Sequence, residues 1–344
     1  AASDVYKRQH GRNVAIGNEA LRAQNAGEDA YNVAIGYYAG TAVTTGTSNT
    51  LIGGFAGDAL TTGLYNIAIG RNALSAEDAH GYNVAIGSFA LLNQDAGTDA
   101  HNVAIGHQAG TTITTGAYNT LVGAYTGDAL TTGARNVAIG HNALTSEDTG
   151  SRSVAVGYDA LATQNYDGLA YNIAIGYNTG SNITNGLYNT LIGGLSGDSI
   201  QGGSNNVALG YAALSDEDGH GRNVAIGAVA LQNQNAGADA YNVAVGYTAG
   251  QNVTTGINNV LIGGLAGDNL STGNYNIAIG KSALTTEDAH GRNVAIGHNA
   301  LFYLNAGADA YNIAIGYEAG LNVTTGTHNT LIGAFAGDNL AGGG

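Results

Sequence analysis

The pentapeptide Asn-Val-Ala-Ile-Gly at residues 32–36 decides the fold, because close variants of it return along the whole chain. Its 19 copies begin at residues 13, 32, 49, 66, 83, 102, 119, 136, 153, 172, 189, 206, 223, 242, 259, 276, 293, 312 and 329. Their spacings run 19, 17, 17 and 17 residues and then repeat, which makes a super-repeat of 70 residues. A fixed period of this size is typical of a solenoid in which each repeat forms one coil.

Each position of the pentad is restricted in a way that has a physical reading. Position 5 is Gly in every copy, which indicates a corner with positive φ or a close approach of two backbones. Position 1 is Asn in every copy except Ser153, so a ladder of amide side chains is expected along the coils. Position 4 is always Ile, Val or Leu, and position 2 is Val or Ile apart from four Thr.

Coil length and composition select the fold class. Seventeen residues are too few for a β-α-β unit, which needs about 30, and frequent Gly disfavours helices. The sequence therefore predicts an all-β parallel β-solenoid, a β-roll or β-helix, with 19 coils of 17 or 19 residues and almost no helix.

Composition excludes several classes of function. The 344 residues include 56 Gly and no Pro, Cys, Met or Trp, so disulfides and thiolate metal sites are absent. Ten basic residues against 25 acidic ones give a net charge of −15, which argues against nucleic acid as a partner. No apolar run approaches the roughly 18 residues of a membrane span, so no membrane contact by this segment is expected.

The chain is expected to form one domain with a foreign leader. Residues 1–9, Ala-Ala-Ser-Asp-Val-Tyr-Lys-Arg-Gln, look like a translated sequencing adaptor, so residues 1–12 are interpreted as a non-native leader and a short lead-in. Residues 13–344 are predicted to be a single continuous β-solenoid, truncated at its C-terminal end. The chain is accordingly expected to be a fragment of a longer gene product.

Side-chain alternation predicts which positions face the interior. If the larger aliphatic residues at positions 2 and 4 fill the coil, then position 3 faces outward. Position 3 is Ala in fourteen coils and Leu in five, which would form an apolar stripe and hence an oligomer seam. The Leu residues of this expected seam are Leu51, Leu121, Leu191, Leu261 and Leu331. The alternative is that Ala is merely small and tolerated outside.

The repeated motif resembles that of a known family. Asn-Val-Ala-Ile-Gly-x-x-Ala segments followed by Thr-Thr-Gly-x-x-Asn turns, as at residues 44–49, look like the head repeats of trimeric autotransporter adhesins, the YadA-like heads. Similar repeats occur in phage and virion fibres. The resemblance covers residues 13–344 and implies a left-handed parallel β-roll, a homotrimer, an extracellular location on a bacterial cell surface and a role in adhesion.

This chain departs from the family pattern in three respects. Its coils are longer, Ala often stands where the family has Ser, and the family's coiled-coil stalk and membrane anchor are not among these residues. The first departure leaves the handedness of the coils open. The last leaves a virion as the alternative location.

Recurrent acidic loops are candidates for a metal site. Glu77, Asp78, Glu217, Asp218, Glu287 and Asp288 repeat in one coil type, and Asp99, Asp239 and Asp309 lie in the next coil. Clustered carboxylates would suit Ca²⁺, although no complete calcium-loop motif is present. The alternative is a solvated acidic ridge that keeps the chain soluble, in which case no cofactor is needed.

Tyrosines before the pentads form a candidate binding surface. They are Tyr31, Tyr65, Tyr82, Tyr118, Tyr171, Tyr188, Tyr241, Tyr275 and Tyr311. Such rings can stack on the sugars of a host-surface glycan or contact a matrix protein, or they can simply cover the corners of the coils.

Repetition argues against catalysis. An active site needs one asymmetric constellation, whereas every candidate group here returns at 70-residue intervals and no nucleophile or phosphate-binding motif appears. The sequence predicts a structural shaft or head of an extracellular adhesin and no enzyme. The alternatives are a phage or virion tail-fibre shaft with receptor (glycan) binding and, more remotely, an ice-binding protein, which would need an unbroken Thr array.

Overall fold

The computed structural model describes residues 11–342, and this part of the chain is all β, with 19 strands and no helix. Residues 1–9, interpreted above as an adaptor leader, lie outside the described residues. The chain forms two compact units, Ala1–Tyr171 and Asn172–Gly344, and each is described by itself.

Each coil contributes one strand of three residues, which is positions 2 to 4 of its pentad. The first unit contains β1 (Val14–Ile16), β2 (Val33–Ile35), β3 (Thr50–Ile52), β4 (Ile67–Ile69), β5 (Val84–Ile86), β6 (Val103–Ile105), β7 (Thr120–Val122), β8 (Val137–Ile139) and β9 (Val154–Val156). The second contains β10 (Ile173–Ile175), β11 (Thr190–Ile192), β12 (Val207–Leu209), β13 (Val224–Ile226), β14 (Val243–Val245), β15 (Val260–Ile262), β16 (Ile277–Ile279), β17 (Val294–Ile296), β18 (Ile313–Ile315) and β19 (Thr330–Ile332).

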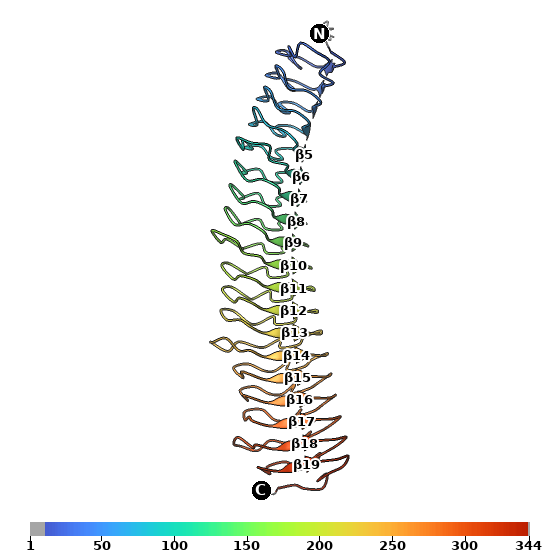
Figure 1. The fold of residues 1–344 in the computed structure, drawn as a ribbon, viewed down its shortest axis with the longest axis vertical. Helices are drawn as coiled ribbons and strands as arrows, with labels where there is room; N and C mark the ends of the chain where they lie inside the picture. Colours follow the sequence, from blue (N-terminus) through green and yellow to red (C-terminus); the bar gives the residue numbers. More distant parts are fainter. Residues whose placement is uncertain (1–10, 343–344) are drawn as a thin grey trace. The chain divides into compact units, whose positions relative to one another are not determined.

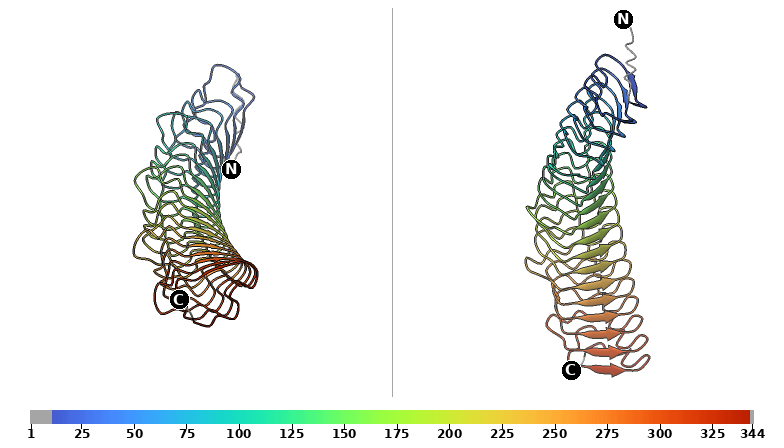
Figure 2. Two further views of the ribbon diagram at one scale, coloured as in Figure 1. Left: turned by 60° about the horizontal axis from the view of Figure 1, so that its bottom comes forward. Right: turned by 45° about the horizontal axis from the view of Figure 1, so that its top comes forward.

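Within each unit the strands stack in chain order and in parallel (Figures 1 and 2). The register places equal pentad positions over one another, so that Val33 pairs with Thr50 and Thr50 with Ile67. The rest of each coil consists of turns and irregular backbone, as the Gly- and Asn-rich loops predict. The predicted parallel β-solenoid is confirmed.

The core is filled from position 3, and the prediction that positions 2 and 4 face inward is wrong. Ala34, Ala68 and their equivalents are fully buried, whereas the flanking Val and Ile are half-buried or exposed. The expected seam is therefore interior: Leu51, Leu121, Leu191 and Leu261 are fully buried, and Leu331 is partly buried in the last coil.

Glycines at position 9 explain why Leu recurs at position 3. In two coils of every four, position 9 is Gly, and a Cβ added to Gly40 or Gly57 would lie 2.6 or 2.8 Å from a methyl group of Leu51. Leu51 thus fills the space that both glycines leave inside the stack. In the other coils Leu at position 9, such as Leu74, fills the same region, which keeps the core volume constant along the stack.

The predicted Asn ladder exists, but its bonds differ from a simple amide stack. The side chain of Asn119 accepts the backbone N–H of Asn136 with its Oδ1 (2.9 Å) and donates from Nδ2 to the carbonyl of Gly133 (2.9 Å). The same pattern recurs along both units, and the buried amides join each coil to the next. They satisfy backbone groups that would otherwise be buried without partners.

Candidate functional site

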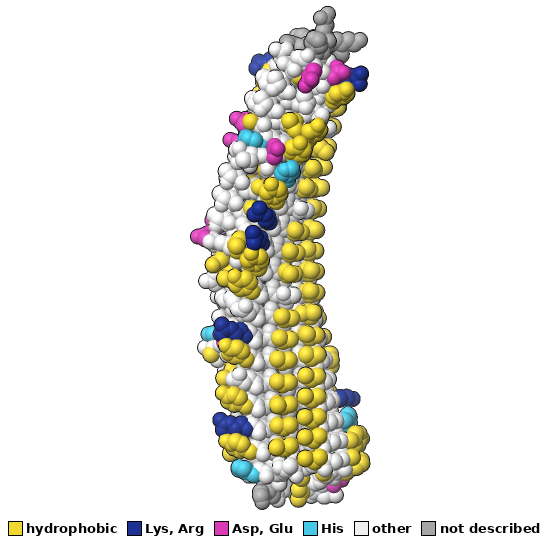
Figure 3. All heavy atoms as spheres, in the orientation of Figure 1, with side chains coloured by type: hydrophobic (Ala, Val, Ile, Leu, Met, Phe, Trp, Pro, Cys, Tyr) yellow, Lys and Arg dark blue, Asp and Glu magenta, His cyan; other side chains and the backbone are white. Residues whose placement is uncertain are grey.

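One face of each unit is an exposed sheet of aliphatic side chains. Positions 2 and 4 of every pentad point outward from the strands and form two parallel columns of Val, Ile and occasional Thr (Figure 3). Ile105 and Ile139 expose 37% and 39% of their surface, although they lie in the middle of the stack. No charged residue occurs at these positions in any of the 19 coils. We call this surface the aliphatic face.

The size of the aliphatic face follows from strand geometry. Coils spaced about 4.8 Å apart and columns about 7 Å apart give each unit a face roughly 45 Å by 10 Å, or about 450 Å². This is comparable to the largest apolar patch on a typical soluble monomer, about 300–600 Å².

An aromatic row follows one edge of the sheet, immediately before the strands. The residue preceding each pentad from the second onward has positive φ. Tyr65, Tyr82, His101 and Tyr118 stack on one another with ring centroids 5.0–5.4 Å apart. All nine predicted tyrosines occupy this row and are exposed: Tyr31, Tyr65, Tyr82, Tyr118, Tyr171, Tyr188, Tyr241, Tyr275 and Tyr311.

Arginines complete the aromatic row, and the sequence analysis missed them. Arg222 lies over the ring of Tyr241 (5.4 Å to the centroid) and donates to its hydroxyl (2.6 Å). Arg12, Arg152 and Arg292 pair in the same way with the Tyr of the next coil. The signal was present, because each Arg precedes its Tyr by 19 residues at the start of a 19-residue coil.

Four buried glutamates form the most unusual electrostatic feature. Glu77, Glu147, Glu217 and Glu287 are fully buried at position 12, where other coils have Val, Leu, Ile or Gln. Burial raises the pKa of all four carboxyls above the ordinary value, and it raises the pKa of Glu217 to about 7. These carboxyls thus lie inside the stack at the point where the acidic loops enter it.

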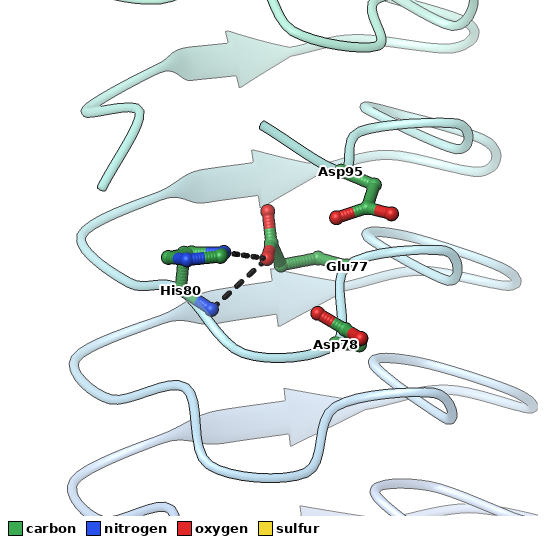
Figure 4. A group of neighbouring side chains, drawn as sticks. All are labelled: Glu77, Asp78, His80 and Asp95. Atoms are coloured by element: carbon green, nitrogen blue, oxygen red, sulfur yellow. Dashed lines mark hydrogen bonds and ion pairs between the residues drawn. The ribbon is translucent and has the colours of Figure 1, made fainter. Parts of the chain in front are cut away.

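Three of these glutamates form clusters with a His and an Asp. Ligand atoms of Glu77, Asp78, His80 and Asp95 all lie within 4.8 Å of one another (Figure 4). Glu217, Asp218 and His220 form a second cluster, and Glu287, Asp288 and His290 form a third. The imidazole Nδ1 lies 3.3, 4.0 and 3.5 Å from the glutamate Oε1 in the three clusters, in that order.

The structure corrects the predicted grouping of the acidic residues. Asp99, Asp239 and Asp309 are absent from these clusters, because their carboxylates accept the backbone N–H groups of Gly81, Gly221 and Gly291 instead. Asp239 and Asp309 also form ion pairs with Arg222 and Arg292. The acid that joins the first cluster from the next coil is Asp95, four residues before the predicted one.

The burial of Glu147 predicts that the stability of the folded chain depends on pH. Burial raises the pKa of this carboxyl in the folded state above its ordinary value of 4.5. The protonated carboxyl therefore contributes to the free energy of unfolding in full below pH 4.5, and this contribution is lost as the pH rises through the folded-state pKa. We expect the free energy of unfolding of the parent, relative to a Glu147→Gln variant, to fall as the pH rises above 4.5. Chemical denaturation at a series of pH values measures this difference. A difference that is constant with pH would contradict it.

Comparison of the chain with protein-family models, with curated proteins and with solved structures finds no match. Within residues 11–342, no helix is long and apolar enough to span a membrane.

Proposed function

We propose that the chain is a structural, non-enzymatic shaft or head of an extracellular adhesin and that it self-associates through the aliphatic face. The single observation behind this proposal is the repetition of an uncharged, outward-facing pair of residues in every coil, which is aliphatic in fifteen coils and a Thr with an Ile or Val in the other four. The motif resemblance described above adds the expectation of three copies and of a bacterial cell surface.

A second copy of the chain is the occupant that the aliphatic face fits best. The face of each unit, about 450 Å², is about half of the roughly 800 Å² that each partner contributes to a stable protein–protein interface. The net charge of −15 opposes association of like chains elsewhere on the surface, but the face itself has no charge. The half-exposed apolar residues form long, regular columns, and the same columns of a second copy can pack against them and cover them.

Charges placed on the aliphatic face should separate the copies. We expect the parent chain to sediment as a trimer at micromolar concentration and an Ile105→Glu, Ile139→Glu double variant to sediment as a monomer. Both side chains are exposed in the single chain, so the monomer should keep its far-UV circular dichroism spectrum. The loss arises because like charges would face one another across a desolvated contact.

The matched control adds the same two charges to exposed turns. Thr62→Glu and Thr132→Glu lie outside the strands at exposed positions, and this variant should remain a trimer. A parent chain that sediments as a stable monomer would remove both the self-association and the trimeric-adhesin proposal.

The aromatic row favours the alternative of a tail-fibre shaft that binds a receptor glycan. Tyr65 and Tyr118, both 53% exposed, stack on their neighbours in the row and present ring edges and hydroxyl groups to solvent, which can contact and hydrogen-bond sugars. Arg side chains along the same row add hydrogen-bond donors for hydroxyl or acidic groups. Binding of soluble glycans in a glycan-array experiment would favour this alternative over a purely structural shaft.

A further inference from the structure

We propose that Glu77, Asp78, His80 and Asp95 bind a divalent transition-metal ion, with Zn²⁺ as the first candidate. This inference is independent of the function proposed above, because it concerns a site inside a single chain. The four side chains come from two consecutive coils, so a bound ion would join the acidic loop of one coil to that of the next (Figure 4).

The strongest observation is a buried carboxylate oxygen without a hydrogen-bond partner. Glu77 is fully buried, and its Oε2 has no hydrogen-bond partner among the described residues. His80 Nδ1 is also buried without a hydrogen bond, although it lies 3.3 Å from Glu77 Oε1. An unpaired buried carboxylate oxygen is costly, and a cation between these atoms would satisfy both.

The equivalent glutamate of the second super-repeat, by contrast, has hydrogen-bond donors for its buried carboxylate. Glu147 accepts hydrogen bonds from Gln164 Nε2 (2.9 Å) and from the backbone N–H of Gly150 (2.7 Å). There Gly150 replaces the His, and Ser153 replaces the usual Asn, so that Gln164 also reaches the Ser153 hydroxyl. In the coil above Glu77, Gln94 bonds instead to Asn102 and the carbonyl of Thr114.

The donor set selects the class of metal. Three carboxylates and one imidazole nitrogen are a mixed oxygen and nitrogen set, which suits Zn²⁺ and its neighbours, whereas Ca²⁺ prefers oxygen alone. Glu77 and His80 are three residues apart on one turn, and the backbone N–H of His80 donates to Glu77 Oε1 (3.0 Å), which fixes their relative position. Asp78 and Asp95 are exposed and give an ion access from solvent.

The repeats supply a natural series of sites. The clusters at Glu217 and Glu287 have the same Glu, Asp and His, but Asn235 and Asn305 stand where the first cluster has Asp95. The first cluster therefore has one more anionic ligand than the other two, and the copy at Glu147 is no cluster at all. We expect one tight site per chain and two weaker ones.

The test titrates the metal-free full chain with Zn²⁺ by isothermal calorimetry at pH 7.5, in the presence of millimolar Ca²⁺. One equivalent should bind at least about tenfold more tightly than any further ion, by analogy with the losses that follow removal of metal-site partners. Asp95→Asn and His80→Ala should each abolish this tight step. Both residues are partly or fully accessible, so the variants should fold, and circular dichroism checks this.

Two matched variants make the outcome decisive. Asp99→Asn removes the same charge from the same coil and should leave the tight step unchanged. Asn235→Asp supplies the missing ligand to the cluster at Glu217 and should raise the number of tight sites from one to two. The proposal fails if Asp95→Asn and Asp99→Asn weaken binding equally, if Ca²⁺ displaces Zn²⁺, or if no Zn²⁺ binds at micromolar concentration.

Discussion

A Gly123→Val variant should lose at least about 3 kcal/mol of its free energy of unfolding, because the substitution combines a strained backbone with a steric clash. Gly123 has φ of 142°, a conformation that a β-branched residue adopts only at high cost. An ideal Cβ at this position would lie 2.6 Å from the carbonyl carbon of Gly140 in the next coil, and closer still to its oxygen. Chemical denaturation of the parent and the variant measures the difference.

Gly54→Val is the matched control. Gly54 lacks a positive φ in the strained range, and the nearest atom that its Cβ would meet is the carbonyl oxygen of Tyr37 at 3.8 Å. The same substitution there should change the free energy of unfolding by less than about 1 kcal/mol. Equal losses at both positions would show that the invariance of position 5 has another cause.

An Asn119→Ala variant should lose about 3 to 5 kcal/mol, because it leaves two buried backbone groups without partners at about 1–3 kcal/mol each and removes packed atoms as well. The N–H of Asn136 would lose its acceptor and the carbonyl of Gly133 would lose its donor. Hydrogen exchange should localise the damage, since the amide of Asn136 would exchange faster than in the parent.

The control for this variant is Asn93→Ala, which changes an exposed Asn in a turn of the same unit. Its free energy of unfolding should stay within about 0.5 kcal/mol of the parent. If Asn119→Ala were as mild, the Asn ladder would have no part in joining the coils.

The periodicity predicted the fold well, but it could not decide which side of each strand faces the core. A strand with aliphatic residues at three consecutive positions has no polar side to mark the outside. Residue size suggested that Val and Ile belong inside, but each coil already places residues such as Leu60 or Leu74 there, so the narrow core has room only for position 3. The Leu that recurs at position 3, such as Leu51, fills the space left by Gly57 of its own coil and Gly40 of the coil before it.

The acidic clusters were predicted in part. The Glu-Asp pairs and the following His were visible in the sequence, but the partner from the next coil was misjudged. Asp95 lies at position 13 of its coil, as Asp78 does in the coil before it, so stacking of equal positions brings Asp95 to the cluster, whereas Asp99 lies four residues further along. The burial of Glu77 could have been inferred from its position, because the same position holds Val43 and Leu60 in the preceding coils.

The stacking of equal positions has a mechanical consequence for each unit. The backbone N–H groups of Val33 and Thr50 each donate to the Asn at the start of the next coil, and the Asn ladder joins the same neighbours. A pull on the ends of the chain therefore acts on one junction after another, beginning at a terminal coil that has a neighbour on one side only, while the remaining coils stay intact. Such a unit would yield by peeling, one coil at a time, and each 17-residue coil would release about 50 Å of extended chain. Its tensile strength would then be set by the weakest junction between two coils, and adding coils would increase its toughness without raising the peak force.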